Sequence, residues 1–356
     1  MAINLSTDTL PLLFALDACP VIGVSGRTIQ FLNEAAQACF GDVPAGTAIR
    51  KLLPAHAALH QASAYFATAR IKRMPYVVSV TSAPGLRLYR LEPVRPHGDR
   101  ARLVMPDELF SAELGLASAF FSAHAAKADE PAVRYYAARL QRTSDQLRRW
   151  LNNTALLQML HSGEGLPGAR ITDCTALLAA ITEAAEPMLA RSGQTLSLTL
   201  PETPCRVRMA PELFETLVLN LISNAMKASG SGGQIRITLM RETNTAHLTV
   251  TDTGEGFAKG VLTEVFRAYA DGDLPRFSDH RAGFGLQVCL AVADELRGSV
   301  LLENSRSSGA AVHVFLPLHT SGKAVMQSPS KPRDPELKNR CRIGFSDALT
   351  DEDYLP

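Results

Sequence analysis

The stretch Asn220-Leu-Ile-Ser-Asn224-Ala-Met-Lys227 decides how this chain is interpreted. Residues three or four apart share one face of a helix, so this segment predicts an apolar helix with one polar stripe: Thr216, Asn220, Asn224 and Lys227. Carboxamide oxygens suit Mg²⁺, which keeps several waters and bridges to phosphates. A lysine adds a point charge for phosphate oxygens. The stripe therefore predicts a magnesium and phosphate site.

A second motif, Asp252-Thr-Gly254-Glu-Gly256, follows 28 residues later (252 − 224). Apolar and polar residues alternate from His247 to Asp252, which predicts a strand that ends at the aspartate. A carboxylate followed by glycines, which let the backbone approach closely, suits the amino edge of a purine. This motif predicts an adenine contact.

The third motif, Gly283-Phe-Gly285-Leu286, comes 31 residues after the aspartate (283 − 252) and opens a helix that we expect to reach Leu296. Free backbone amides and the dipole at a helix N-terminus favour phosphate. Each motif is weak alone, but their order and intervals together indicate a nucleotide site.

In these motifs the chain resembles the ATP-binding domain shared by sensor histidine kinases, DNA gyrase, the heat-shock chaperone of that class and MutL-type repair proteins. The resemblance spans residues 169–318 and implies an α/β sandwich that binds Mg²⁺ and ATP. It implies that Asn220 and Asn224 hold Mg²⁺-ATP and that Asp252 selects adenine. The remaining residues of the implied ATP site are Lys227, Gly254, Gly256, Gly283, Gly285 and Leu286.

Val265-Phe266-Arg267-Ala268-Tyr269 resembles the aromatic box of histidine kinases, within a segment from Phe257 to Arg281 that resembles their mobile ATP lid. Phe266 and Arg281 therefore join the expected ATP site.

The ATP-hydrolysing relatives carry a glutamate four residues before the metal-binding asparagine. Here Asn220 stands four before Asn224, Thr216 stands four before Asn220, and Glu215 is one position out, about 100° round the helix. The pattern is of kinase type.

The composition indicates a soluble protein of several domains. The formal net charge of +1 over 356 residues argues against a strongly electrostatic nucleic-acid binder. No apolar run approaches the roughly 18 residues that span a membrane, and the start lacks the basic flank of a signal peptide. Six scattered cysteines indicate neither a zinc site nor a disulfide framework. We expect a cytoplasmic protein without a membrane span and without a nucleic-acid partner.

Four parts are expected along the chain. Residues 1–97 resemble a PAS sensor domain of α+β type, most clearly from Leu16 to Ala36. Residues 104–165 are predicted to form two helices, residues 169–318 the ATP-binding domain, and residues 319–356 a disordered tail. A short helical docking motif at Ile343 to Leu349 is the alternative for the end of the tail.

The two predicted helices carry heptad-like apolar seams and a short connection, which indicates an antiparallel hairpin; two hairpins would form a dimeric four-helix bundle. The second helix begins near Pro131, and its predicted polar face carries Arg134, Arg142, Arg148 and Arg149. A structural coiled coil is the alternative, but the position before an ATP domain gives a resemblance to the dimerisation and phosphotransfer hairpin of histidine kinases.

In that family the first helix carries a phosphorylated histidine followed by a glutamate. Here Ser111-Ala112-Glu113-Leu114 matches this box with Ala112 in place of the histidine, and Glu113 stands where the family has its general base. His124 is the less favoured candidate phosphoacceptor, because it continues the apolar seam and lacks a following acid.

The sequence thus predicts a two-component signalling protein that resembles a sensor histidine kinase. The alternative is a non-catalytic, ATP-binding dimeric scaffold, or pseudokinase, that regulates a partner kinase or a response regulator.

Overall fold

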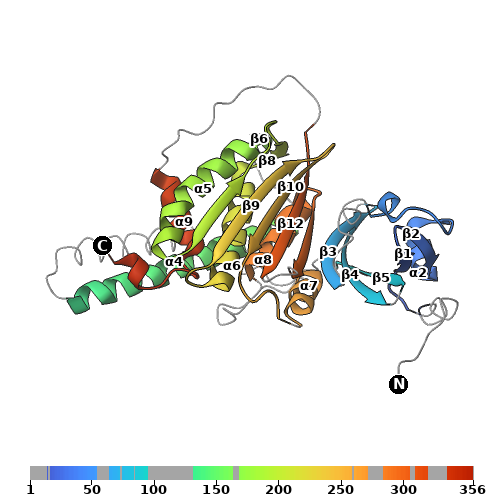
Figure 1. Cartoon of the computed structure of the whole chain (residues 1–356), viewed down its shortest axis with the longest axis horizontal. Helices are drawn as coiled ribbons and strands as arrows, with labels where there is room; N and C mark the ends of the chain where they lie inside the picture. Colours follow the sequence, from blue (N-terminus) through green and yellow to red (C-terminus); the bar gives the residue numbers. More distant parts are fainter. Residues whose placement is uncertain are drawn as a thin grey trace.

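The computed structural model describes residues 14, 17–53, 64–72, 74–83, 85–94, 131–162, 168–258, 260–271, 284–304, 309–319 and 335–355. Figure 1 shows a β-rich N-terminal part beside a larger α/β part, with one long helix running beneath the latter. Ten strands from the two parts form one sheet in the order β2-β1-β5-β4-β3-β11-β12-β10-β9-β7, and β6 and β8 of the α/β part form a separate two-stranded sheet.

The N-terminal part is an antiparallel five-stranded sheet with a short helix. Asn33 fixes its start, because its side chain accepts hydrogen bonds from the backbone N–H groups of Val21 and Ala36 and so joins the first strand to the helix N-terminus. The elements are β1 Val21–Ser25, β2 Thr28–Leu32, α2 Glu34–Phe40, η1 Ile49–Lys51, β3 Ala64–Ile71, β4 Met74–Ala83 and β5 Leu86–Pro93.

The second part is the mixed α/β domain that the sequence predicts. Helices α5, α6 and α8 lie against one face of strands β7, β9, β10 and β12 (Figure 1), and the hydrophobic core fills the space between them. Its elements are β6 Arg170–Asp173, α5 Cys174–Arg191, β7 Thr195–Thr199, β8 Arg206–Met209, α6 Pro211–Ser229, β9 Gln234–Arg241, β10 Thr245–Asp252, α7 Val261–Asp271, α8 Phe284–Glu295, β11 Ser299–Asn304 and β12 Ala310–Pro317. The predicted strand that ends at Asp252 is confirmed.

The two parts meet along β3 and β11, which pair antiparallel with Leu302 opposite Phe66. Helix α7 lies against β3 and β4, and the ring of its Phe266 stacks on Phe66 with 5.4 Å between the centroids. Beside this stack, Arg70 donates from Nε and Nη2 to the carboxylate of Asp294 on α8. The sheet of the N-terminal part is thus in direct contact with the lid-like helix α7.

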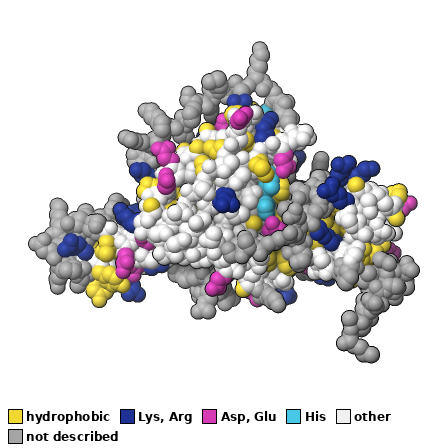
Figure 2. Space-filling view, viewed as in Figure 1, with side chains coloured by type: hydrophobic (Ala, Val, Ile, Leu, Met, Phe, Trp, Pro, Cys, Tyr) yellow, Lys and Arg dark blue, Asp and Glu magenta, His cyan; other side chains and the backbone are white. Residues whose placement is uncertain are grey.

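Helix α4, Pro131–Ser162, confirms the second predicted helix and packs against α8 and α9. Figure 2 shows hydrophobic side chains gathered near the end of α4 that projects from the domain, and the exposed apolar residues there are Tyr135, Tyr136 and Leu140. The predicted first helix, with Ala112, Glu113 and His124, lies outside the described residues.

One face of α4 differs from the prediction. Arg149, expected on the outward polar face, is only 6% exposed, because α6 and the C-terminal segment cover it. The heptad pattern could not show this, since it treats every position off the seam as solvated.

The C-terminal tail also differs from the prediction of disorder over the part that the structure describes. Helix α9, Pro335–Phe345, and the 3₁₀ turn η3, Glu352–Tyr354, pack on α4, α5 and α6. The apolar residues Leu337, Cys341, Phe345 and Leu349 recur every four positions and are all buried, which is the spacing of one helical face. None of the described helices is long and apolar enough to cross a bilayer.

Candidate nucleotide site

Helix α6 holds the first motif. Pro211 opens the helix, as suits a first-turn position, and Gly230 follows its last residue with φ of 61°, a left-handed conformation that favours glycine. Apolar residues bury most of its surface, yet Asn220 is also buried, at 3% exposure. Burial is confined to Asn220, which α4 and α8 cover, whereas Thr216 and Asn224 are partly buried and Lys227 is exposed at the end of the stripe.

The third motif lies directly against the first. A Cβ atom on Gly285 would lie 2.9 Å from Asn220 Oδ1 and 3.3 Å from both polar atoms of the Asn224 carboxamide, so only glycine leaves these side chains undisturbed. The backbone at the start of α8 thus approaches both asparagines. This contact places the N-terminus of α8 beside the two carboxamides of α6.

The two asparagines differ in their hydrogen bonds. Asn220 Oδ1 accepts from Arg149 Nη2 at 2.9 Å and from Asn153 Nδ2 at 3.3 Å, both on α4. The Asn224 carboxamide makes no hydrogen bond to the described part of the chain, and its Nδ2 is shielded from solvent. An unpaired donor that is shielded from solvent costs free energy, and a ligand that accepts a hydrogen bond from Asn224 Nδ2 would remove that cost.

The carboxamides fit a magnesium ion that is shared with a nucleotide. The described residues contain no cluster of three or more His, Cys, Asp or Glu side chains that could hold a metal alone. Mg²⁺ keeps several waters and needs only one or two protein ligands when phosphates supply the rest. In such an arrangement Asn224 would offer its Oδ1 to the ion, whereas Asn220 Oδ1 already accepts hydrogen bonds from α4.

Asp252 lies where the sequence places it, at the end of β10. Its Oδ1 accepts from the backbone N–H groups of Gly254 at 2.9 Å and Ala310 at 3.3 Å, which fixes the carboxylate. Burial raises the pKa of Asp252, and the two amide donors oppose this rise. A Cβ atom on Gly254 would lie 2.3 Å from the carbonyl oxygen of Ala228, so the glycine lets this turn pack against the end of α6.

The structure describes some of the residues that are expected at the ATP lid. Phe266, expected at the ATP, is 1% exposed and stacks on Phe66 of the N-terminal sheet. Leu286 is buried in α8, and Gly256 adopts φ of 78° beside Asn304, which holds Phe257 by two hydrogen bonds. Arg281 and Gly283 lie outside the described residues.

A charged cluster that the motifs do not predict lies next to Lys227. Arg149 Nη1 donates to Ser223 Oγ at 2.9 Å and to Asp347 Oδ2 at 2.7 Å, and the Lys227 ammonium lies 3.6 Å from the same carboxylate oxygen. Burial lowers the pKa of Arg149, and Asp347 opposes this effect. Burial, followed by the charge of Arg149, lowers the pKa of Lys227, and the carboxylate of Asp347 opposes this shift. Two cations thus share one carboxylate.

Glu215, the residue one position out from the hydrolase pattern, forms an ion pair with Arg340 of α9.

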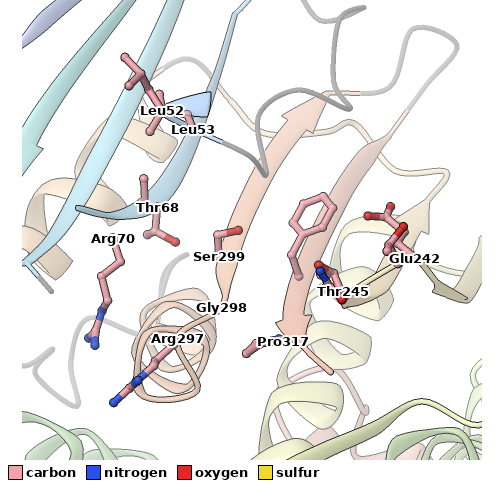
Figure 3. A pocket seen from close by; sticks show the side chains of 14 residues that line it. Leu52, Leu53, Thr68, Arg70, Glu242, Thr245, Arg297, Gly298, Ser299 and Pro317 are labelled. Carbon is pink, nitrogen blue, oxygen red and sulfur yellow. The ribbon is translucent and has the colours of Figure 1, made fainter. Parts of the chain in front are cut away.

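Two cavities adjoin these elements. One of about 490 Å³ opens between the two parts of the molecule (Figure 3), where its labelled lining includes Leu52, Thr68, Arg70, Glu242, Arg297 and Ser299. None of its lining residues belongs to the three motifs, so it is separate from the nucleotide site. A smaller one of about 120 Å³ is lined by Arg149, Asn153, Glu215, Asn220 and Arg340 and opens beside the first asparagine.

Residues 209–320 match the family described as Histidine kinase-, DNA gyrase B-, and HSP90-like ATPase. The chain contains a histidine-kinase-type ATP-binding domain. The asparagine stripe, the Asp252 turn and Gly285 all lie within the matched residues.

Curated relatives are sensor kinases. The Sensor protein KdpD of Escherichia coli (strain K12) is 31% identical over 126 residues, which are 35% of this chain and 14% of that protein. The Sensor-like histidine kinase SenX3 of Mycolicibacterium smegmatis is 27% identical over 208 residues, 57% of this chain and 53% of that protein. The matched region thus spans only part of these relatives.

Solved structures that align with this chain include histidine kinase ThkA in complex with response regulator protein TrrA, at 14% identity and a TM-score of 0.41 over 86% of this chain and 98% of that one. The mycobacterial sensor histidine kinase MprB aligns at 23% identity and a TM-score of 0.35, over 43% of this chain and 99% of that one.

Proposed function

We propose that this protein binds Mg²⁺-ATP and works in two-component signalling as a protein of sensor histidine kinase type. The observation that carries the proposal is the Asn224 carboxamide, which is free of hydrogen bonds to the described residues and lies against Gly285 at the start of α8. A buried amide next to a helix N-terminus and one turn from Lys227 suits a metal ion that bridges to phosphates.

Each of the three polar side chains would then contact a different part of the nucleotide. Asn224 orients the metal-bound phosphates, Lys227 neutralises their charge, and Asp252 accepts from an adenine amino group through its second carboxylate oxygen. Bound ATP would supply the phosphoryl group for any transfer. Gly254 and Gly285 keep the backbone close enough to α6 for these side chains to converge.

The N-terminal five-stranded sheet supports a PAS-like sensor, and helix α4, the second helix of the predicted hairpin, supports a homodimer formed through residues 104–165. The contact of β3 and β4 with α7 gives such a sensor a direct path to the lid segment. A response regulator or a partner kinase is the proposed partner. Light scattering of the purified chain at several concentrations tests the dimer.

Ala112 stands at the expected phosphoacceptor position, and a methyl group cannot accept phosphate. A non-catalytic scaffold that uses ATP to set its shape is therefore the second candidate function. Transfer in cis would require His124, with Glu113 left without its usual neighbour.

Titration calorimetry of the full chain with ATP, with and without Mg²⁺, tests binding. We expect Mg²⁺-dependent binding that falls at least about tenfold in Asn224→Ala, since a lost hydrogen bond or ligand to a charged group is worth about 1.5–3 kcal/mol. Asn244→Ala, in the exposed turn between β9 and β10, is the matched control and should bind like the wild type. Equal affinity of wild type and Asn224→Ala would refute the site.

Incubation with γ-labelled ATP separates the two candidate functions. Acid-labile label on the wild type that is lost in His124→Ala would establish a working kinase and contradict the assignment of Ala112. ATP binding without label, alone and with candidate regulators, would support the scaffold.

A further inference from the structure

A buried arginine on α4 ties the nucleotide helix to the C-terminal segment. The Arg149 guanidinium is 6% exposed and contacts three groups: Asn220 Oδ1, Ser223 Oγ and Asp347 Oδ2. Two of these groups lie on α6, one turn apart, and the third comes from the turn after α9. A charge is stable at this depth only with a partner of opposite sign, and Asp347 is that partner.

Asp347 also faces Lys227. The same carboxylate oxygen lies 2.7 Å from Arg149 Nη1 and 3.6 Å from Lys227 Nζ. An arginine and a lysine that converge on one anionic oxygen form the arrangement that proteins use for phosphate, since the guanidinium donates directional hydrogen bonds and the ammonium acts as a point charge. The carboxylate oxygen thus stands where a phosphate oxygen would be recognised.

The C-terminal segment holds this carboxylate firmly. Phe345 and Ser346, immediately before it, are fully buried, and Arg142 of α4 binds both the Ser346 carbonyl oxygen and the Asp351 carboxylate. On α9, Arg342 Nε lies 3.1 Å from the buried Asp145 carboxylate of α4. Contacts on both sides of Asp347 therefore fix its position against α6.

We propose that Arg149 is a further phosphate-binding residue of the nucleotide site, and that Asp347 occupies the Arg149–Lys227 pair as an internal competitor of the ATP phosphates. The inference rests on the proposed function, because it needs a nucleotide at α6. Phosphate and Asp347 cannot pair with these two cations at once, so ATP binding and docking of the C-terminal segment exclude each other at this point.

The competition lowers the apparent affinity for Mg²⁺-ATP by the fraction of molecules in which the pair is free. Charge-assisted hydrogen bonds are worth about 1.5–3 kcal/mol each, so an intact contact corresponds to a reduction on the order of tenfold to a hundredfold. Whatever displaces the C-terminal segment would restore the site.

The test is titration calorimetry of the full chain with Mg²⁺-ATP for the wild type, Asp347→Asn, Asp351→Asn and Arg149→Gln in the Asp347→Asn background. Asp347→Asn keeps the shape and removes the competing charge, so its Kd should fall at least about tenfold. Asp351→Asn is the matched control, because that carboxylate is in the same segment and pairs with Arg142 instead. Its Kd should stay within about twofold of the wild type. Far-UV circular dichroism and emission of Trp150, the single tryptophan, verify that all variants fold.

Adding Arg149→Gln to Asp347→Asn should weaken binding again by about tenfold if the arginine holds phosphate. Equal affinities of wild type and Asp347→Asn, with binding that still depends on Asn224, would overturn the competition and leave the proposed function standing. No loss on adding Arg149→Gln would overturn the role of Arg149. Absence of Mg²⁺-ATP binding in every variant would refute the proposed function itself.

Discussion

The stack of Phe66 on Phe266 offers a direct measure of how strongly the N-terminal sheet holds the lid-like helix α7. Phe266 is 1% exposed, and its ring centroid lies 5.4 Å from that of Phe66 at an interplanar angle of 24°. Removing a fully buried phenylalanine ring costs about 3–5 kcal/mol, and the partly exposed Phe66 should cost about 2 kcal/mol. Paired rings add about 0.5–1.5 kcal/mol beyond the area that they bury.

A double-mutant cycle of Phe66→Ala and Phe266→Ala isolates the stacking energy of the two rings. We expect the double variant to lose about 1 kcal/mol less than the sum of the single losses, because the stacking energy is counted in both single variants. Urea unfolding of the full chain, followed by circular dichroism and by Trp150 emission, supplies the free energies of unfolding. Phe66→Ala combined with Phe345→Ala, whose ring is buried under α9, is the control and should be additive within about 0.5 kcal/mol. Additivity of the Phe66 and Phe266 losses would refute the claim that this contact couples the two parts.

Three other changes test separate features. Gly285→Ala places a methyl group against the two carboxamides of α6, which are movable side-chain ends. The free energy of unfolding, followed by thermal unfolding, should therefore change by less than about 1 kcal/mol, while the Mg²⁺-ATP affinity measured by calorimetry falls at least about tenfold. Unchanged affinity would contradict the site geometry. Burial, with His313 second, lowers the pKa of His247 from 6.5 to about 4, so the unfolded state binds more protons between these values and stability should drop as pH falls from 6.5 to 4, by up to about 3 kcal/mol. His247→Gln should flatten this part of the curve of unfolding free energy against pH, and an unchanged slope would exclude His247 as its source. Phe345→Ala empties a fully buried site under α9 and should cost about 3–5 kcal/mol in urea unfolding, whereas a loss below about 1 kcal/mol would show that the C-terminal segment is not docked in solution.

Local patterns alone were enough for the parts of the site that lie on single elements. The spacing of Asn220, Asn224 and Lys227 follows from the helical repeat, and the alternation before Asp252 follows from the strand repeat. These features are determined by neighbours within a few residues.

The contacts that complete the site join distant parts of the chain. Arg149 meets Asn220 across 71 residues and Asp347 across 198, and neither distance leaves a periodic trace. The four-residue spacing of apolar residues from Leu337 to Leu349 fits one face of a helix. The polar composition of the preceding residues instead led to the prediction of a disordered tail. Nothing in the local pattern around Phe266 shows that its ring stacks on Phe66 of the N-terminal sheet, 200 residues away in the sequence (266 − 66).

The sequence by itself determined that this chain carries, in this order, a helix with an asparagine stripe, a turn that begins at Asp252 and a helix that begins at a glycine motif. Only the tertiary structure decided that a buried arginine and a C-terminal carboxylate meet at that helix, and that helix α7 packs on the N-terminal sheet. The physical reason is that side-chain periodicity reports which face of an element is buried, whereas the identity of the group that covers that face depends on how distant elements pack.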